Sequence, residues 1–167
     1  MKNYLLLVLI LLAGCQPKEE VIKVEEENWA KHRAVVSETD SLVHGKSYLS
    51  VYSQIYSFTE NQKNSVTATV SMRNVSETDT IYVLKAAFYN TEGVKIRSYF
   101  DFPIAIVPME TIQIVIPHED NEGGTGSNFL FEWKTPGNCP EPLFEGVMCS
   151  TQGTQGFSFS TQAVRTN

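Results

Sequence analysis

The sequence predicts an all-β protein, an antiparallel β-sandwich of roughly eight strands. Apolar and polar residues alternate from Val66 to Met72, and this period of two is typical of a strand with one buried face. Turn-forming residues such as those at 90–93 separate this run from further β-rich runs. The chain after Ser41 has no amphipathic helix, which argues against enzymes built from repeated β-α units.

The stretch Val66–Pro117 is the centre of the predicted fold, and its successive runs predict an antiparallel meander. Its second strand, Ile81–Tyr89, is apolar on both faces, which predicts a central strand whose outer face is also covered. The other expected strands have similar β-rich composition and lie at Tyr48–Phe58, Val94–Phe100, Ile112–Ile116, Phe129–Trp133, Phe144–Cys149 and Phe157–Thr161.

Residues 1–14 have the composition of a signal peptide. Lys2 supplies a basic start, and Tyr4–Ala13 is an unbroken apolar run that is too short to span a bilayer as a mature helix. The run ends in Leu12-Ala13-Gly14-Cys15, which closely resembles the lipobox of bacterial lipoproteins. The resemblance implies cleavage before Cys15 and acyl chains, palmitate among them, on its sulfur and new amine. The alternative is an ordinary secretory signal that happens to precede a cysteine.

An acylated Cys15 would make the lipid bilayer a partner of this chain, because three acyl chains exceed the two signals that stable anchoring needs. The residue after Cys15 is Gln16, whereas an acidic residue at this position would resemble a signal for retention in the inner membrane. Its absence favours the outer membrane. We therefore expect a lipid-anchored protein of the cell envelope, with the periplasmic face and the surface both open. Residues 15–41 are polar and acidic, which indicates a solvated tether before a sandwich domain at 42–167.

Three tyrosines at a spacing of four, Tyr48, Tyr52 and Tyr56, form a stripe in the first expected strand. Their serine, β-branched and aromatic neighbours favour a strand, with a possible bulge, over a helix. Tyrosine is enriched at binding surfaces, which makes Tyr52 and Tyr56 candidates for contact with a ligand or partner. The alternative is that these side chains are half-buried residues of a strand.

The loop between Pro117 and Phe129 carries three glycines and three carboxylates. Glycines this close together favour a structural turn, because they allow backbone conformations that a side chain would forbid. The carboxylates could instead bind a cation, but the EF-hand spacing from Asp120 places Phe131 where a glutamate is needed. A single histidine gives zinc little support, and we predict no metal and no cofactor. The candidate contact residues of the loop are His118, Asp120, Gly124 and Asn128.

Cys139 and Cys149 remain once Cys15 is assigned to lipid. The oxidising envelope favours a disulfide between them, and the loop-entropy model assigns roughly 2–3 kcal/mol to so short a loop. Redox catalysis would favour a Cys-x-x-Cys spacing, which is absent. Two free thiols are the alternative to the disulfide.

Several motifs, in order along the chain, are similar to those of one bacterial family. They are Val51-Tyr52-Ser53-Gln54-Ile55-Tyr56, Ser71-Met72-Arg73-Asn74, Phe88-Tyr89-Asn90-Thr91-Glu92-Gly93, Gly123-Gly124-Thr125-Gly126-Ser127-Asn128-Phe129, Glu145-Gly146-Val147-Met148 and Gly156-Phe157-Ser158-Phe159-Ser160. Together they resemble the domain of unknown function 3124 family, small envelope proteins that are often lipoproteins, over Val43–Val164. The two cysteines do not belong to that pattern, and the family has no assigned activity. The chain is also similar to immunoglobulin-like modules, which implies an immunoglobulin-like sandwich.

The sequence offers no convincing catalytic constellation. The histidines are few, and Ser127 is not part of a Gly-x-Ser-x-Gly elbow. The net charge of −6 and the lack of a basic aromatic stripe argue against nucleic acid as a partner. We therefore expect a non-catalytic protein-interaction or structural module with an envelope protein as partner. The alternatives are a small-ligand or carbohydrate-binding module, and a hydrolase or metal-dependent enzyme that uses the loop His118–Asn128.

Overall fold

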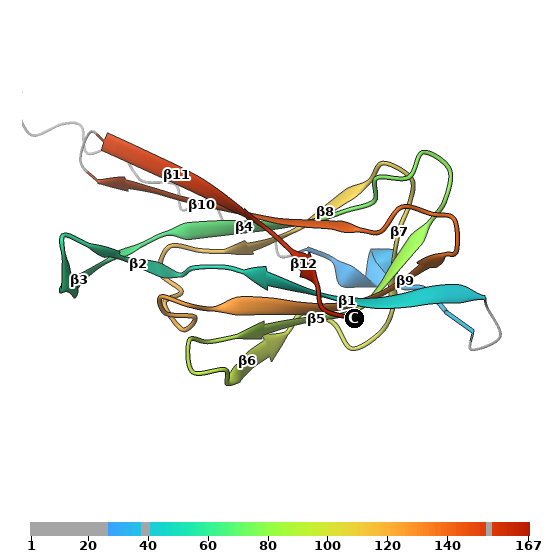
Figure 1. Ribbon diagram of the computed structural model, residues 1–167, viewed down its shortest axis with the longest axis horizontal. Coiled ribbons are helices and arrows are strands. Elements are labelled where there is room, and N and C mark those ends of the chain that lie inside the picture. The colour runs from blue at the N-terminus through green and yellow to red at the C-terminus, as the bar shows by residue number, and fades with distance from the viewer. Residues whose placement is uncertain (1–26, 38–40, 153–154) are drawn as a thin grey trace, which may run out of the picture.

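The computed structural model describes residues 27–37, 41–152 and 155–167, which form an antiparallel β-sandwich as predicted (Figure 1). A 3-10 helix, η1 (Trp29–His32), is followed in this part of the chain by twelve strands rather than roughly eight, because several are short. The strands are β1 (Leu42–Ser50), β2 (Gln54–Ser57), β3 (Thr59–Ser65), β4 (Thr67–Arg73), β5 (Ile81–Tyr89), β6 (Lys95–Ser98), β7 (Ile104–Ile106), β8 (Thr111–Ile116), β9 (Asn128–Pro136), β10 (Leu143–Gln152), β11 (Gln155–Gln162) and β12 (Val164–Arg165).

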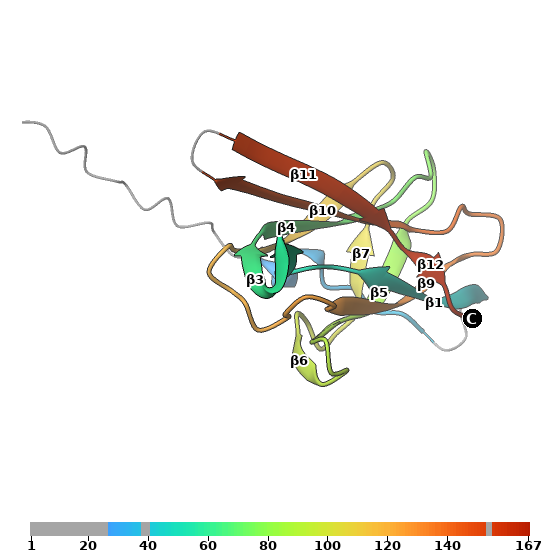
Figure 2. The same cartoon turned by 60° about the vertical axis from the view of Figure 1, so that its left-hand side comes forward.

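The strands form two facing sheets and one separate hairpin (Figures 1 and 2). The six-stranded sheet has the order β12-β1-β9-β5-β6, with β7 paired to β5, and the four-stranded sheet has the order β11-β10-β4-β8. The β2–β3 and β10–β11 hairpins project at one end of the molecule, which we call the hairpin end (Figures 1 and 2). The region where the two sheets face each other is called the body.

The meander predicted for Val66–Pro117 is wrong, because β4 and β5 lie in different sheets. The turn between them is held by the side chain of Asn74, which is buried. Its amide nitrogen donates to the carbonyl oxygens of Asp79 (2.7 Å) and Ile106 (2.9 Å), and its amide oxygen accepts from the Ser76 N–H (2.9 Å). These hydrogen bonds fix the path that carries the chain from one sheet to the other.

Strand β5 is central, as predicted, and its outer face is partly covered, since Ala87 is fully buried and Tyr82, Leu84 and Tyr89 are half-buried. Its pairing with β9 shifts between Val83 and Lys85, so a bulge at this point reverses which residues face the core. Ile81 and Val83 are buried before the shift, and Ala86 and Phe88 are buried after it. The two alternating sets therefore exchange faces along the strand, and the residues that face outward are apolar as well.

The single strand expected at Tyr48–Phe58 is two strands, β1 and β2, which belong to different sheets. The break lies at Val51–Ser53. There the Val51 N–H donates to the Ser127 carbonyl (2.9 Å) and the Ser53 N–H donates to the Gly124 carbonyl (3.1 Å). Strand β3 was not expected, because Thr59–Ser65 contains no apolar residue and so no hydrophobic period.

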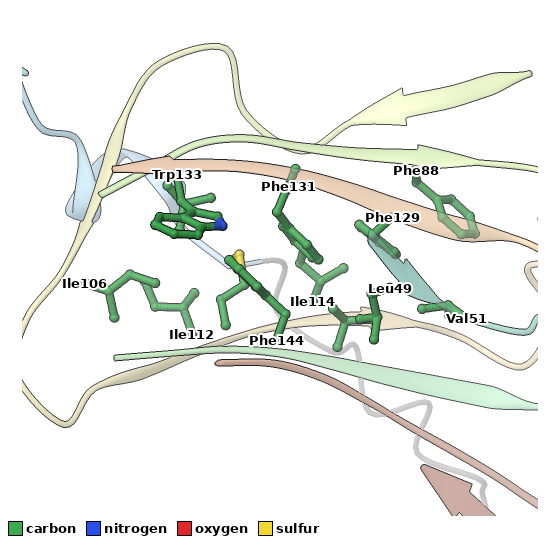
Figure 3. Packing of buried hydrophobic residues seen from close by; sticks show 14 of the residues in the cluster. Leu49, Val51, Phe88, Ile106, Ile112, Ile114, Phe129, Phe131, Trp133 and Phe144 are labelled. Atoms are coloured by element: carbon green, nitrogen blue, oxygen red, sulfur yellow. The ribbon is translucent and has the colours of Figure 1, made fainter. Parts of the chain in front are cut away.

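The core contains a row of aromatic rings that extends from β9 toward the four-stranded sheet (Figure 3). Phe129 and Phe131 are stacked at 5.4 Å between centroids, and Phe131 stacks on Phe144 of β10 at 4.1 Å. Trp133 is fully buried, and its indole N–H donates to the Ser47 hydroxyl (3.0 Å), which removes the cost of burying that donor.

Part of the predicted tether packs against the sandwich. Trp29 lies 5.1 Å from Phe100 between ring centroids, and the Ala34 N–H donates to the Pro103 carbonyl (2.8 Å). Since an indole against the core is not a solvated side chain, a solvated tether through residue 41 is the wrong description of Trp29–Ala34. Residues 15–26 and 38–40 of that predicted segment lie outside the described part of the chain.

Candidate functional site

The glycine-rich loop between β8 and β9 acts as a structural clamp at the hairpin end. The Gly124 carbonyl accepts from the N–H groups of Ser53 (3.1 Å) and Gln54 (3.0 Å), and the Gly123 carbonyl accepts from the N–H and hydroxyl of Thr91 (both 3.1 Å). Gly124 has a φ of +71°, a conformation that favours glycine. The candidate residue Gly124 therefore joins the loop to β2 through its backbone.

Gly123 leaves no room for a side chain. A β-carbon there would lie 2.6 Å from the Ser53 hydroxyl and 2.7 Å from both the Phe88 ring and the Ser127 hydroxyl. The Ser127 hydroxyl donates to the Val51 carbonyl (2.6 Å), whereas the Ser53 hydroxyl is fully buried and has no hydrogen-bond partner. Close packing at the base of the loop is thus achieved at the cost of one unsatisfied hydroxyl.

The acidic residues of the loop are paired with Arg97 of β6. The guanidinium lies 2.6 Å from the Asp120 carboxylate and 3.0 Å from that of Glu122. Burial lowers the pKa of Arg97, but the hydrogen bond to Asp120 and the charges of Tyr99, Asp120 and Glu122 together raise that pKa above its ordinary value. Asp120 therefore serves as one half of an ion pair, and the described residues contain no group of three His, Cys, Asp or Glu side chains that could hold a metal ion.

Tyr99 lies close to this ion pair. Burial is the main cause that raises the pKa of its phenol to about 12, with an opposing contribution from Arg97 and a reinforcing one from Asp120. The Tyr99 ring also stacks on Phe129 at 5.6 Å, so the ion pair borders the aromatic core directly.

His118 and Glu119 lie on the other side of the loop and border an open pocket of about 540 Å³. The pocket lies on the outer face of the four-stranded sheet, where Thr67, Cys149 and Ser158 are directly opposite one another on β4, β10 and β11. The inner face is excluded because the next residues in register, Ala68 and Met148, are buried in the core. The lining consists of Thr67, His118, Glu119, Cys149, Ser150, Thr151, Gly156, Phe157 and Ser158.

The pocket is rich in hydrogen-bonding groups that carry no charge. The hydroxyls of Thr67, Thr151 and Ser158 can each donate and accept, and His118 and Glu119 add an imidazole and a carboxylate at one side. Among the described residues, no hydrogen bond or ion pair joins His118 to Glu119 or Cys149. This arrangement can bind a polar group, but a nucleophile hydrogen-bonded to its base is not formed.

The candidate tyrosines do not join this pocket. Tyr52 follows β1 and packs edge-on against Phe159 at 5.7 Å, whereas Tyr56 of β2 is 56% exposed and lies beneath the ammonium of Lys63. Asn128 begins β9 opposite Ser50. Of the four candidates in the loop, only His118 lines the pocket.

Cys139 and Cys149 are both free, so the predicted disulfide is not formed. Cys139 lies in the turn before β10, and Cys149 lies six residues beyond Leu143, about 20 Å along the extended strand. A disulfide requires α-carbons within about 7 Å, which the rigid strand prevents. Cys15 lies outside the described residues, and no helix among the described residues is long and apolar enough to cross a membrane.

Sequence reasoning did not identify the hydroxyls of Thr67, Thr151 and Ser158 as site residues. A signal was present, because Thr67 and Thr69 are the outward members of an alternating strand. Recognising a pocket, however, required the pairing of β4 with β10 and of β10 with β11, which join residues that are far apart in the sequence.

The comparisons with known proteins identify a family without adding an activity. A family model described as "Protein of unknown function (DUF3124)" matches residues 44–166. No curated protein matches the chain. Among solved structures, the chain is similar to one described as "Crystal Structure of Thermotoga maritima 1070", with 9% sequence identity and a TM-score of 0.45, over 72% of this chain and 92% of that chain.

Proposed function

We propose, from the premise that this chain belongs to the DUF3124 family of proteins of unknown function, that it is a lipid-anchored binding module of the bacterial envelope. It acts by contact and without catalysis. The resemblance of Leu12-Ala13-Gly14-Cys15 to a lipobox supports the anchor, and Gln16 supports the outer membrane.

One observation carries the binding surface. Val115, Thr69, Val147 and Ser160 form a single row across β8, β4, β10 and β11, on the outer face of the four-stranded sheet. The two valines are 38% and 46% exposed, and their neighbours on this face include the hydroxyls of Thr69 and Ser160 and the ion pair of Glu145 with Arg73. An apolar centre with a polar rim is typical of a protein contact surface.

The absence of catalysis is supported by the acidic groups of the loop. Asp120 and Glu122 are both paired with Arg97, so neither is a free general base for a hydrolase that uses His118–Asn128. Because these carboxylates already pair with Arg97, they are less available to bind a cation.

The contact surface is tested with a photoreactive amino acid at Val147 in cells that carry the full chain. We expect a discrete protein adduct that disappears when Val115→Asp is added. The control position is Glu92, an exposed residue of the β5–β6 turn. A Val147 chain that forms no adduct, or the same adducts as the Glu92 chain, would contradict the proposal.

The anchor is tested separately with Cys15→Ala, which we expect to release the protein to the soluble fraction. Cys139→Ala is the matched control, and it should leave membrane association unchanged. Retention of the Cys15→Ala protein in washed membranes would exclude lipid anchoring through this residue.

A small polar ligand, such as a carbohydrate, is a second candidate partner that the pocket beside His118 favours. Three hydroxyls, an imidazole and a carboxylate border it. Binding of a panel of oligosaccharides, measured by calorimetry, should be lost in His118→Ala and Thr67→Val while the Val147 adduct persists. Absence of binding across the panel would leave protein contact as the function.

A further inference from the structure

Strand β11 is a free edge of the four-stranded sheet. It pairs with β10 on one side, and no described strand pairs with its other side. Near its end the Ala163 N–H donates to the Phe144 carbonyl (2.9 Å), so the ladder alternation directs the backbone groups of Gly156, Ser158 and Ser160 away from β10. Unpaired backbone groups in a row are a template for an added strand.

The edge lacks the devices with which proteins usually block strand addition. Residues Gln155–Gln162 contain no charge and no proline, and the β10–β11 hairpin projects beyond the body (Figures 1 and 2). The outermost strands of the six-stranded sheet are charged: β6 carries Lys95 and Arg97, and β12 carries Arg165. Strand β8 is also uncharged, but the Glu110 carboxylate before it lies 3.8 Å from His32 of η1, so its beginning is next to the N-terminal segment.

The residues of β11 match a second β11 running in the opposite direction. A strand that pairs with itself places like residues near each other, so any charge on it would be repelled by its own copy. With Ser158 opposite Ser158 of a second copy, Phe157 falls opposite Phe159 and Gly156 opposite Ser160. Each pair then combines residues of the same face, and the outward backbone groups of Gly156, Ser158 and Ser160 become hydrogen-bonded.

We propose that β11 pairs antiparallel with β11 of a second copy of this chain, which joins the two four-stranded sheets into one continuous sheet. Gly156 and Ser158 line the pocket next to His118, so the two pockets become neighbours across the two-fold axis. This inference concerns the sheet edge, and it does not depend on the contact proposed for the outer face.

The pairing is tested with the full chain in nanodiscs. Cys139→Ser and Cys149→Ser leave Cys15 for the anchor, and Ser158→Cys is then added. Paired strands would hold the two introduced thiols about 5.5 Å apart between α-carbons. We expect a covalent dimer on mild oxidation, at least tenfold faster than for Gln113→Cys on the β8 edge in the same background. Equal rates at the two edges would overturn the proposal.

A second measurement avoids cysteine chemistry. Ser158 and Ser160 are exposed, so Ser158→Lys with Ser160→Lys should leave the fold intact while placing like charges opposite each other. In detergent, sedimentation should show a dimer of the unaltered chain and at least a tenfold weaker dimer of the double variant. A monomer of the unaltered chain, or a dimer that the lysines leave unchanged, would also overturn the proposal.

Discussion

The body and the hairpin end use aromatic side chains in opposite ways. In the body, Phe131 and Trp133 are fully buried, whereas at the hairpin end Phe58 is 94% exposed at the tip of β2–β3. Phe58 also has a φ of +59°, a backbone conformation that is costly for a bulky residue. The comparison indicates that the body buries its aromatic rings to stabilise the fold, while the hairpin end leaves an aromatic ring in solvent.

The largest effect that tests this comparison is expected from Phe131→Ala. Removing a ring that is stacked on both Phe129 and Phe144 should cost about 3–5 kcal/mol of unfolding free energy. Phe157→Ala, in the half-buried part of β11, should cost about 1 kcal/mol. Urea unfolding measures both, and equal costs would mean that the hairpin end is as important for stability as the body.

The next effect concerns close packing at a glycine. A β-carbon on Gly45 would overlap three atoms of the Trp133 ring, so Gly45→Ala should cost about 1–3 kcal/mol. Gly137 has no neighbouring atom within 4 Å of such a carbon, and Gly137→Ala should change stability by less than about 0.5 kcal/mol. A thermal shift for Gly45→Ala no larger than that of Gly137→Ala would show that the body can relax around the indole.

Replacing two buried serines with alanine should affect stability differently. Ser47→Ala leaves the Trp133 indole N–H without its acceptor and should destabilise the body by about 1–2 kcal/mol. Ser53→Ala removes a hydroxyl that has no partner at the base of the hairpin end, and it should be neutral or slightly stabilising. Chemical unfolding measures the stability of both variants. A loss of unfolding free energy of similar size in the two would contradict this prediction.

The smallest effect is expected from a charge cluster on the outside of the six-stranded sheet. Burial raises the pKa of Glu132, but the hydrogen bond from Lys85 and the charges of Lys85 and Lys46 lower it by more. The net effect is a pKa below its ordinary value. A lowered pKa stabilises the fold above the unfolded-state pKa, and this stabilisation is lost as pH falls through the lowered folded-state value.

Because these side chains are partly exposed, Glu132→Gln should cost only a few tenths of a kcal/mol at neutral pH. The cost should shrink as the pH falls below the ordinary pKa of a glutamate and in high salt, which unfolding curves at several pH values can measure. A cost that is independent of pH would assign the effect of Glu132 to packing.

The fold class was predictable because alternation marks most strands, and the family was recognisable from its motifs. The sheet assignment was not predictable, since the amide of Asn74 that directs β4 and β5 into different sheets leaves no period in the sequence. The bulge in β5 exchanges which alternating set faces the core, and the alternation in the sequence does not reveal it. Local patterns thus identify strands, but which strands pair depends on contacts between residues far apart in the chain.

The candidate site was predictable only in part, for the same reason. His118 stood out because its loop is unusual, and it does line the pocket. The hydroxyls opposite it come from β4, β10 and β11 and look like ordinary outward residues in the sequence. Cys139 and Cys149 are close in sequence, but Cys139 lies in the turn before β10 and Cys149 lies far along that extended strand, which made the disulfide prediction wrong.

The pairing of β1 has a consequence for the order of events during synthesis. Ser47 lies opposite Phe131 on one side and Arg165 on the other, and the Thr166 N–H donates to the Lys46 carbonyl (2.9 Å). Strand β1 can therefore complete its pairing only after residues 164–166 have been synthesised. Such distant pairing slows folding, because the long segment between the paired strands must close into a loop before their contacts can form.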